Sequence, residues 1–326
     1  MKPVAPLRWV AAAMLVLGVL FPAQALAQPR FYWKSLSDAN AVPVILNSMS
    51  GNTNPFDPAH VVTPGANFSG TLAMAGYART FSLFDRATMV AVIVPMGRVS
   101  GEVTVAGSSA AQSANGVGDP MVEFDINVLG PRAQKDLVQA LRFEPGFSLD
   151  VLADLAFPIG QYDNSQPLNL GQHRWYGRVG APIVWQLGPW VPGQRTTLEC
   201  VPVVWFFGPN NDYLEGKTLK TDPMLQLDAH LTRDFTAQFW GSLDATWYYG
   251  AGSSLDGVQS AKKLNNFGVG ATLGYQITDN LGLTVGYKTT VGANAPEDLR
   301  MDSFMVTLVF GWHSLIEGVK RLESGR

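Results

Sequence analysis

The sequence predicts an all-β protein: a transmembrane antiparallel β-barrel of about twelve strands, with long extracellular loops and short periplasmic turns. Three observations predict this class. Apolar and polar residues alternate with a period of two over long stretches. Several stretches reach the roughly 9–11 residues that a membrane-crossing strand needs, whereas strands of soluble proteins typically have five or six. The connections between the stretches are alternately long and short.

The composition supports this class. Of 326 residues, 47% are hydrophobic and only 15% are charged, while 33 Gly and 21 Pro interrupt the chain. Such a chain is too apolar to be disordered and too rich in Gly and Pro for a helical membrane bundle. The formal net charge of −3 gives no basic excess, so nucleic acid is not an expected partner. The lone Cys200 allows neither an intramolecular disulfide nor a Cys-based zinc site, and we expect no metal and no cofactor.

The first 27 residues resemble an export signal. Lys2 and Arg8 precede an apolar run over residues 9–21, and small residues end at Ala27. The apolar run is shorter than the roughly 20 residues that span a bilayer, so we expect cleavage after Ala27 rather than a membrane anchor. The next segment, 28–65, contains five prolines and little alternation. It is expected to form no strands and either to plug the lumen or to lie in the periplasm.

Alternation then continues almost to the C-terminus. The run 264–276 places Phe267 and Leu273 on one face and Asn266 and Thr272 on the other, and a three-residue link joins it to a similar run. The barrel is therefore assigned to residues 66–313, followed by a C-terminal extension, 314–326. Its expected strands are 66–78, 82–96, 99–106, 119–129, 139–157, 173–187, 195–207, 223–231, 235–249, 264–277, 281–291 and 301–313.

Aromatic residues fall near the expected strand ends, as in the interfacial girdles of membrane barrels. Chance alone also places some of the nine Trp and nine Tyr there, so this is supporting evidence only. The expected girdle residues are Trp175, Tyr248 and Tyr249 at the outer ends and Trp185, Tyr275 and Trp312 at the inner ends.

Charged residues on the strands should face the lumen, because a charge at mid-depth in lipid costs roughly 2–4 kcal/mol. They either form salt bridges that only stabilise the barrel or a polar constriction that selects solutes. Asp150 and Asp154 are expected to face Arg174 and Arg178 on the next strand. The candidate lumen or solute-path residues are Arg142, Glu144, Asp150, Asp154, Arg174, Arg178, Asp228, His230 and Asp244; Glu199 and Lys288 should also point inward.

Little in the sequence indicates an enzyme. His230, Asp228 and Asp244 share one face of neighbouring strands, which fits an acid/base or metal cluster but fits a hydrogen-bonded lumen histidine better. A barrel lipid hydrolase would need a serine hydroxyl at His230 or His173. Cys200 alternates with Leu198 and is expected to face lipid.

One stretch carries a family resemblance. Residues 157–163 (FPIGQYD) and 169–175 (NLGQHRW), with 116–120 (GVGDP) and the closing hairpins, resemble the outer-membrane family of MetA-pathway phenol-degradation transporters. The resemblance covers nearly the whole mature chain. It implies an exported β-barrel that passes hydrophobic or aromatic small molecules.

Taken with the residues, the resemblance favours an outer-membrane channel or transporter for small hydrophobic or aromatic compounds in a Gram-negative bacterium. A non-transporting structural barrel and a barrel lipid hydrolase are the alternatives. The expected partners are outer-membrane lipid and lipopolysaccharide, the barrel-assembly machinery and a small-molecule solute.

Overall fold

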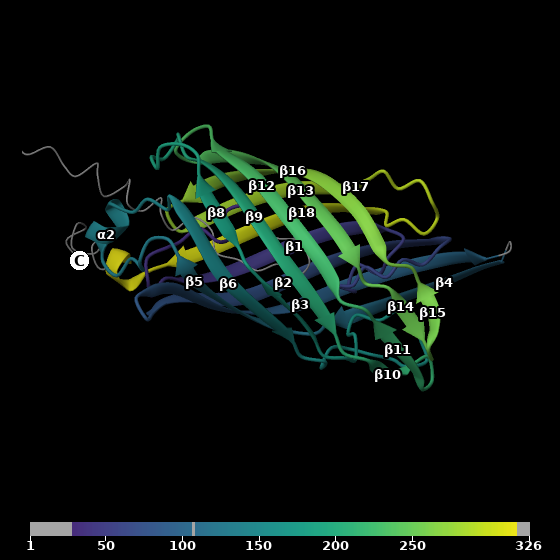
Figure 1. Cartoon of the computed structure of the whole chain (residues 1–326). Coiled ribbons are helices and arrows are strands. Elements are labelled where there is room, and N and C mark those ends of the chain that lie inside the picture. Colours follow the sequence, from purple (N-terminus) through teal and green to yellow (C-terminus); the bar gives the residue numbers. More distant parts are fainter. Residues whose placement is uncertain (1–27, 106–107, 318–326) are drawn as a thin grey trace, which may run out of the picture.

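The computed structural model describes residues 28–105 and 108–317, and these form a closed antiparallel β-barrel of twelve tilted strands (Figure 1). The predicted fold class and strand number are confirmed. In one position of the barrel, two short strands, β7 and β8, follow one another. The barrel strands are β1 (Asn40–Gly51), β2 (Ala66–Leu83), β3 (Arg86–Val105), β5 (Met121–Leu129), β6 (Phe147–Ala156), β7 (Tyr176–Gly180), β8 (Ile183–Gln186), β9 (Thr196–Phe207), β12 (Met224–Asp234), β13 (Phe239–Gly250), β16 (Leu264–Thr278), β17 (Leu281–Val291) and β18 (Met301–Trp312).

The barrel closes where β1 pairs with β18, in register from Asn40 opposite Trp312 to Gly51 opposite Met301. The expectation that 28–65 holds no strand and that the barrel starts at residue 66 was therefore wrong. Strand β1 has apolar residues on both faces, with Ile45 buried and Val44 exposed on the outside. A strand that is apolar on both faces gives no period-two signal, which is why the alternation missed it.

Other boundaries also need correction. The two expected strands 82–96 and 99–106 are one long strand, β3. The predicted number of strands is nevertheless twelve, because the division of β3 added one strand and the omission of β1 removed one. The expected strand 139–157 begins only at Phe147, because a short helix, α2 (Leu137–Leu141), precedes it. Asp136 caps this helix by accepting a hydrogen bond from the backbone N–H of Gln139, as helix N-caps commonly do.

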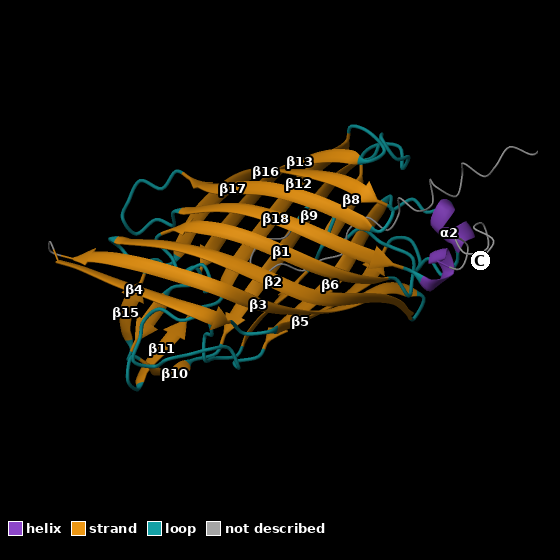
Figure 2. Cartoon of the chain, turned by 180° about the vertical axis from the view of Figure 1, so that it is seen from behind, coloured by secondary structure: helices purple, strands orange, loops and turns teal. Residues whose placement is uncertain are grey.

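The two ends of the barrel differ. The helix end carries α2 and short turns such as 278–281, and the loop end carries the long connections (Figure 1). At the loop end, β3 runs on beyond its neighbours and pairs with β4 (Ser108–Val117) to form a projecting hairpin (Figure 2). A small separate sheet also lies there, made of β10 (Asn210–Tyr213), β11 (Lys217–Thr221), β14 (Ser253–Leu255) and β15 (Val258–Ala261).

Two segments of the chain fold inward against the lumen side of the strands. Residues 28–37, the inner segment, contact the strands from within and leave at the helix end, where Leu36 bridges to Gln134. Residues 52–65, the cap segment, fold against the loop end, with Ala59 and His60 almost fully buried. These segments, rather than a conventional protein core, cover much of the apolar surface inside the barrel.

The expected signal peptide, 1–27, and most of the expected C-terminal extension, 318–326, lie outside the described residues. Within the described residues, none of the helices has the length and apolarity required to cross a membrane.

Candidate functional site

The lumen collects most of the predicted site residues. Burial alternates along the strands, and the inward face carries the charges while the outward face is apolar. Buried in the lumen are Asp150, Asp154, Arg174, Arg178, Asp228, His230 and Asp244, together with Glu199. Arg142 and Glu144 were placed wrongly: both are exposed at the helix end, because the chain there forms α2 and a turn rather than a strand.

One polar wall is formed by β5, β6 and β7. Arg178 forms ion pairs with Asp154 and with Glu123, the latter at 3.3 Å between Nη2 and Oε2. The guanidinium of Arg178 also lies 5.2 Å from the ring of Trp205. Sequence reasoning placed Arg178 against the carboxylates of β6 but missed Glu123. Every second residue of β5 over 121–127 is buried in the lumen, including Met121, Glu123 and Asp125. The alternation of this strand in the sequence would have revealed Glu123.

The facing polar wall is formed by β12, β13, β16 and β17. His230 donates through Nδ1 to Asp244 at 2.7 Å, and Asp244 also accepts from Ser242 and Thr272, each at 2.6 Å. Asp228 accepts from Gln226 and Thr246, each at 2.6 Å, and lies 3.8 Å from the Lys288 ammonium. Buried carboxylates need such partners to stay charged.

The inner segment is fastened to both walls. Lys34 forms ion pairs with Asp150 and, at 3.5 Å, with Asp125. On the other side, the Arg30 guanidinium lies between the rings of Trp33 and Trp240, 4.3 Å from each, and pairs with Asp234 at 2.6 Å. The hypothesis that Asp150 pairs with an arginine of the next strand needs correction, because its cation comes from residue 34.

Glu199 completes this attachment. Its carboxylate accepts from the backbone N–H of Arg30 at 2.7 Å and from the indole N–H of Trp33 at 2.9 Å. No sequence pattern indicated that Arg30, Trp33 or Lys34 would meet these strands, since the partners lie more than a hundred residues away.

The cap segment is fastened through Arg174. This buried residue of loop 157–175 contacts Asp57 at 3.4 Å and donates to Thr221 at 2.7 Å, so it links the cap segment to its own loop and to β11. His60 packs edge-on against Tyr248, with ring centroids 5.0 Å apart. Burial lowers the pKa of His60 to about 4, so the imidazole is neutral at pH 7.

The two motifs that carried the family resemblance meet beside the cap segment. The Asp119 carboxylate accepts from the backbone N–H groups of Gly160 and Gln172, at 2.9 and 2.7 Å. A Cβ at Gly160 would lie 2.6 Å from the backbone of Gly118, so only glycine fits at this contact. The motifs therefore fix the loops that carry Arg174.

The third wall, formed by β18, β1, β2 and β3, is uncharged and mostly apolar. Among the described residues of these four strands no charged side chain is buried. Its inward side chains include the apolar Ile45, Leu72, Met74, Ile93 and Met305 and the polar Asn47, Thr80, Thr88, Ser303 and Thr307. The lumen therefore has one uncharged, mostly apolar side and two charged sides. Its buried carboxylates, Asp57, Glu123, Asp125, Asp150, Asp154, Glu199, Asp228, Asp234 and Asp244, outnumber its basic groups, Arg30, Lys34, Arg174, Arg178, Arg195 and Lys288.

The arrangement that a hydrolase needs is not found in the described part of the chain. The Nε2 atom of His230 has no hydrogen-bond partner there, and Ser242 donates to Asp244 instead. His173 is exposed and stacks on Tyr162 at 4.7 Å. Among these described residues, no group of three or more His, Cys, Asp or Glu side chains is placed to hold a metal ion.

On the outside of the barrel, four of the six expected aromatic residues are exposed, while Trp312 is half-buried. Trp175 and Tyr249 lie near the loop end, and Trp185 and Tyr275 lie near the helix end. Tyr248, expected in the girdle, is buried in the lumen because it lies on the same face of β13 as Asp244. Cys200 is half-buried and lies on the same outward face of β9 as the exposed Leu198 and Phe206.

Comparison with known proteins agrees with this geometry. The structure resembles an outer membrane channel from Pseudomonas putida F1, with a TM-score of 0.68 and 18% identity over 90% of this chain and 100% of that one. The transport unit of the autotransporter AIDA-I from Escherichia coli follows, with a TM-score of 0.48 and 8% identity over 94% and 97% of the two chains. No curated protein sequence matches. Residues 51–304 match the model of the family described as "Putative MetA-pathway of phenol degradation", and the chain therefore belongs to that family.

Proposed function

We propose that the protein is an outer-membrane channel for small aromatic solutes that carry a polar substituent, held closed at rest by its inner segment. The observation that carries this proposal is the divided lumen, with an uncharged, mostly apolar wall of β18, β1, β2 and β3 opposite charged walls. An aromatic ring can slide along the apolar wall while its polar group exchanges hydrogen bonds with the charged ones. The family membership and the fold of the Pseudomonas putida channel support the same function.

The excess of carboxylates in the lumen adds a charge preference. A constriction lined by more carboxylates than basic groups favours cations and neutral solutes over anions. The long loops then face the outside and α2 faces the periplasm, as in barrels whose short turns are periplasmic. Twelve strands enclose a path too narrow for bulk diffusion and suited to small molecules.

The test is single-channel recording of the refolded protein in planar bilayers, with p-cresol as the probe. We expect cation-selective currents of low open probability and brief interruptions that become more frequent with p-cresol concentration. Glucose, which has no apolar ring face, serves as the control and should cause fewer interruptions. Absence of any current, from wild type and from a variant with a loosened inner segment, would instead favour a non-transporting structural barrel.

A further inference from the structure

The middle of the lumen contains a cluster of charged side chains whose hydrogen bonds are incomplete. Arg178 lies between Glu123 and Asp154, and each of the three residues is at most 6% exposed. Nη1 of Arg178 has no hydrogen-bond partner, while the carboxyl groups of Glu123 and Asp154, opposite one another on β5 and β6, hydrogen-bond to each other. Buried polar atoms are nearly always satisfied, so a donor left over beside two carboxyl groups suggests a ligand.

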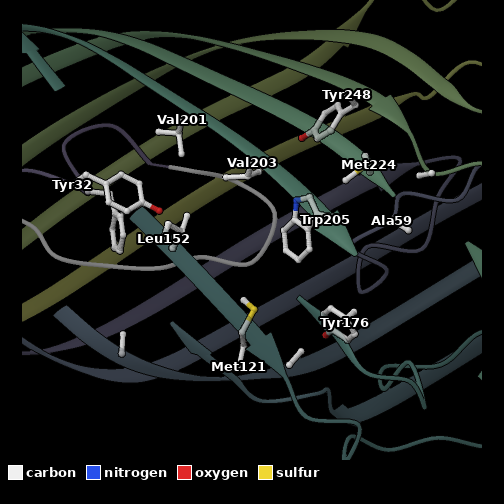
Figure 3. Close-up of a cluster of buried hydrophobic side chains, with 14 of the residues drawn as sticks. Tyr32, Ala59, Met121, Leu152, Tyr176, Val201, Val203, Trp205, Met224 and Tyr248 are labelled. Atoms are coloured by element: carbon white, nitrogen blue, oxygen red, sulfur yellow. The ribbon is translucent and has the colours of Figure 1, made fainter. Parts of the chain in front are cut away.

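Apolar and aromatic groups surround this cluster. Trp205 is fully buried next to Arg178, and Leu152 and Met121 belong to the same buried cluster (Figure 3). The free guanidinium donor matches a hydroxyl group, whose oxygen accepts from a guanidinium and whose hydrogen can be donated to a neighbouring carboxyl group. The apolar neighbours match a ring. The chemistry of the cluster therefore fits a hydroxylated aromatic compound.

A hydroxylated aromatic ring is already present there, supplied by the chain itself. Tyr32 of the inner segment is 3% exposed, and its phenol interacts electrostatically with Glu123, Arg178 and Asp154. Its ring belongs to the same buried cluster as Leu152 and Val203 (Figure 3). It also packs edge-on against Phe31, with ring centroids 4.5 Å apart. Lys34 and Arg30, on either side of Tyr32, hold the segment in this position through their ion pairs.

We infer that Tyr32 occupies a binding site for phenolic solutes, formed by Glu123, Asp154, Arg178 and Trp205, so that a phenol in the path and the seated inner segment exclude one another. This inference rests on the proposed function and names its central site. A phenol bound at the site replaces the tyrosine ring and thereby favours withdrawal of the segment. The closed state is then relieved by the class of compound that the channel carries.

Competition gives a quantitative test. The apparent affinity of wild type for p-cresol is reduced by the fraction of molecules in which Tyr32 has withdrawn. Tyr32→Ala removes the competitor, so we expect it to bind p-cresol about tenfold more tightly than wild type, or better. Binding is measured by calorimetry on the full-length protein in detergent. Toluene, which lacks the hydroxyl, should bind Tyr32→Ala more weakly than p-cresol does.

Three variants make the result decisive. Phe31→Ala removes the neighbouring ring and should leave p-cresol affinity weaker than in Tyr32→Ala. Glu123→Gln supplies its own amide donor to the cluster and should weaken p-cresol binding in the Tyr32→Ala background. Tyr32→Phe keeps the ring and loses only the hydroxyl, so it tests the competition without opening a cavity, and it should bind p-cresol more tightly than wild type.

Equal affinities of wild type, Tyr32→Phe and Tyr32→Ala, or equal binding of toluene and p-cresol, would overturn the inference. These outcomes are distinct from failure of the proposed function, because binding in detergent does not require conduction. Tight p-cresol binding by Tyr32→Ala without any current would keep the site and reject the channel. Current interruptions by p-cresol with equal affinities would keep the channel and reject the role of Tyr32.

Discussion

The most direct prediction concerns Lys34, which fastens the inner segment to the wall of β5 and β6. Replacing Lys34 with Gln removes the ammonium that lies between Asp150 and Asp125. Both carboxylates are buried and would then face one another, and within the described part of the chain Asn127, 2.8 Å from Asp150, is the native side chain left to donate to them. The substitution should therefore weaken the docking of the inner segment.

The size of the effect follows from the cost of leaving a buried charge unpaired. Removing one partner of a buried ion pair costs about 3–5 kcal/mol. Because 1.4 kcal/mol is a factor of ten, the lower figure alone shifts the docking equilibrium about a hundredfold toward the open state. We expect Lys34→Gln to raise the open probability in single-channel recordings, while the heat-dependent shift in gel mobility that reports the folded barrel persists.

Lys135→Gln is the matched control, because Lys135 pairs with Asp85 on the surface, where its side chain is 51% exposed. An exposed pair contributes about 0–1 kcal/mol, so the control should gate as wild type does. The double variant Lys34→Gln/Asp150→Asn removes one of the two stranded carboxylates and should recover part of the closure. An open probability for Lys34→Gln equal to that of the control would refute this role of the ion pair.

Three further predictions concern other parts of the barrel. Cys200, outward-facing and half-buried between apolar neighbours, should react in micelles with a lipophilic thiol reagent and resist a charged one; rapid reaction with the charged reagent would show that it does not face lipid. His60 has a pKa lowered from 6.5 to about 4, so the stability it contributes is present above pH 6.5 and is lost as the pH falls toward 4, by about 3 kcal/mol in total. His60→Asn, which tolerates the positive φ of 49° at this position, should flatten the decline of melting temperature over that range; an unchanged slope would contradict the assignment. Asp119→Ala removes two backbone contacts worth about 1.5–3 kcal/mol each, so limited proteolysis should cut loop 157–175 faster while the strands stay protected, and an unchanged rate would count against Asp119 as the anchor of that loop.

The sequence by itself determined the fold class and the facing of most strand residues. Alternation is a local property of a strand, because successive side chains point to opposite faces. The alternation alone therefore predicted correctly that Asp154, Asp228 and Asp244 face inward and that Cys200 faces outward. The same reasoning failed at β1, where both faces are apolar, and at Arg142 and Glu144, where a helix and a turn replace the strand. Local alternation cannot show either exception.

Only the tertiary structure decided what fills the lumen. Lys34 meets Asp150 across 116 residues of chain, and Trp33 meets Glu199 across 166. Nothing local in a proline-containing segment specifies such partners, because they are chosen by closure of the barrel and by the cost of leaving buried charges unpaired. The sequence thus showed which side chains face the lumen, while the fold alone showed that residues 28–37 supply Arg30 and Lys34 to the carboxylates there and place Tyr32 in the buried cluster with Leu152 and Trp205.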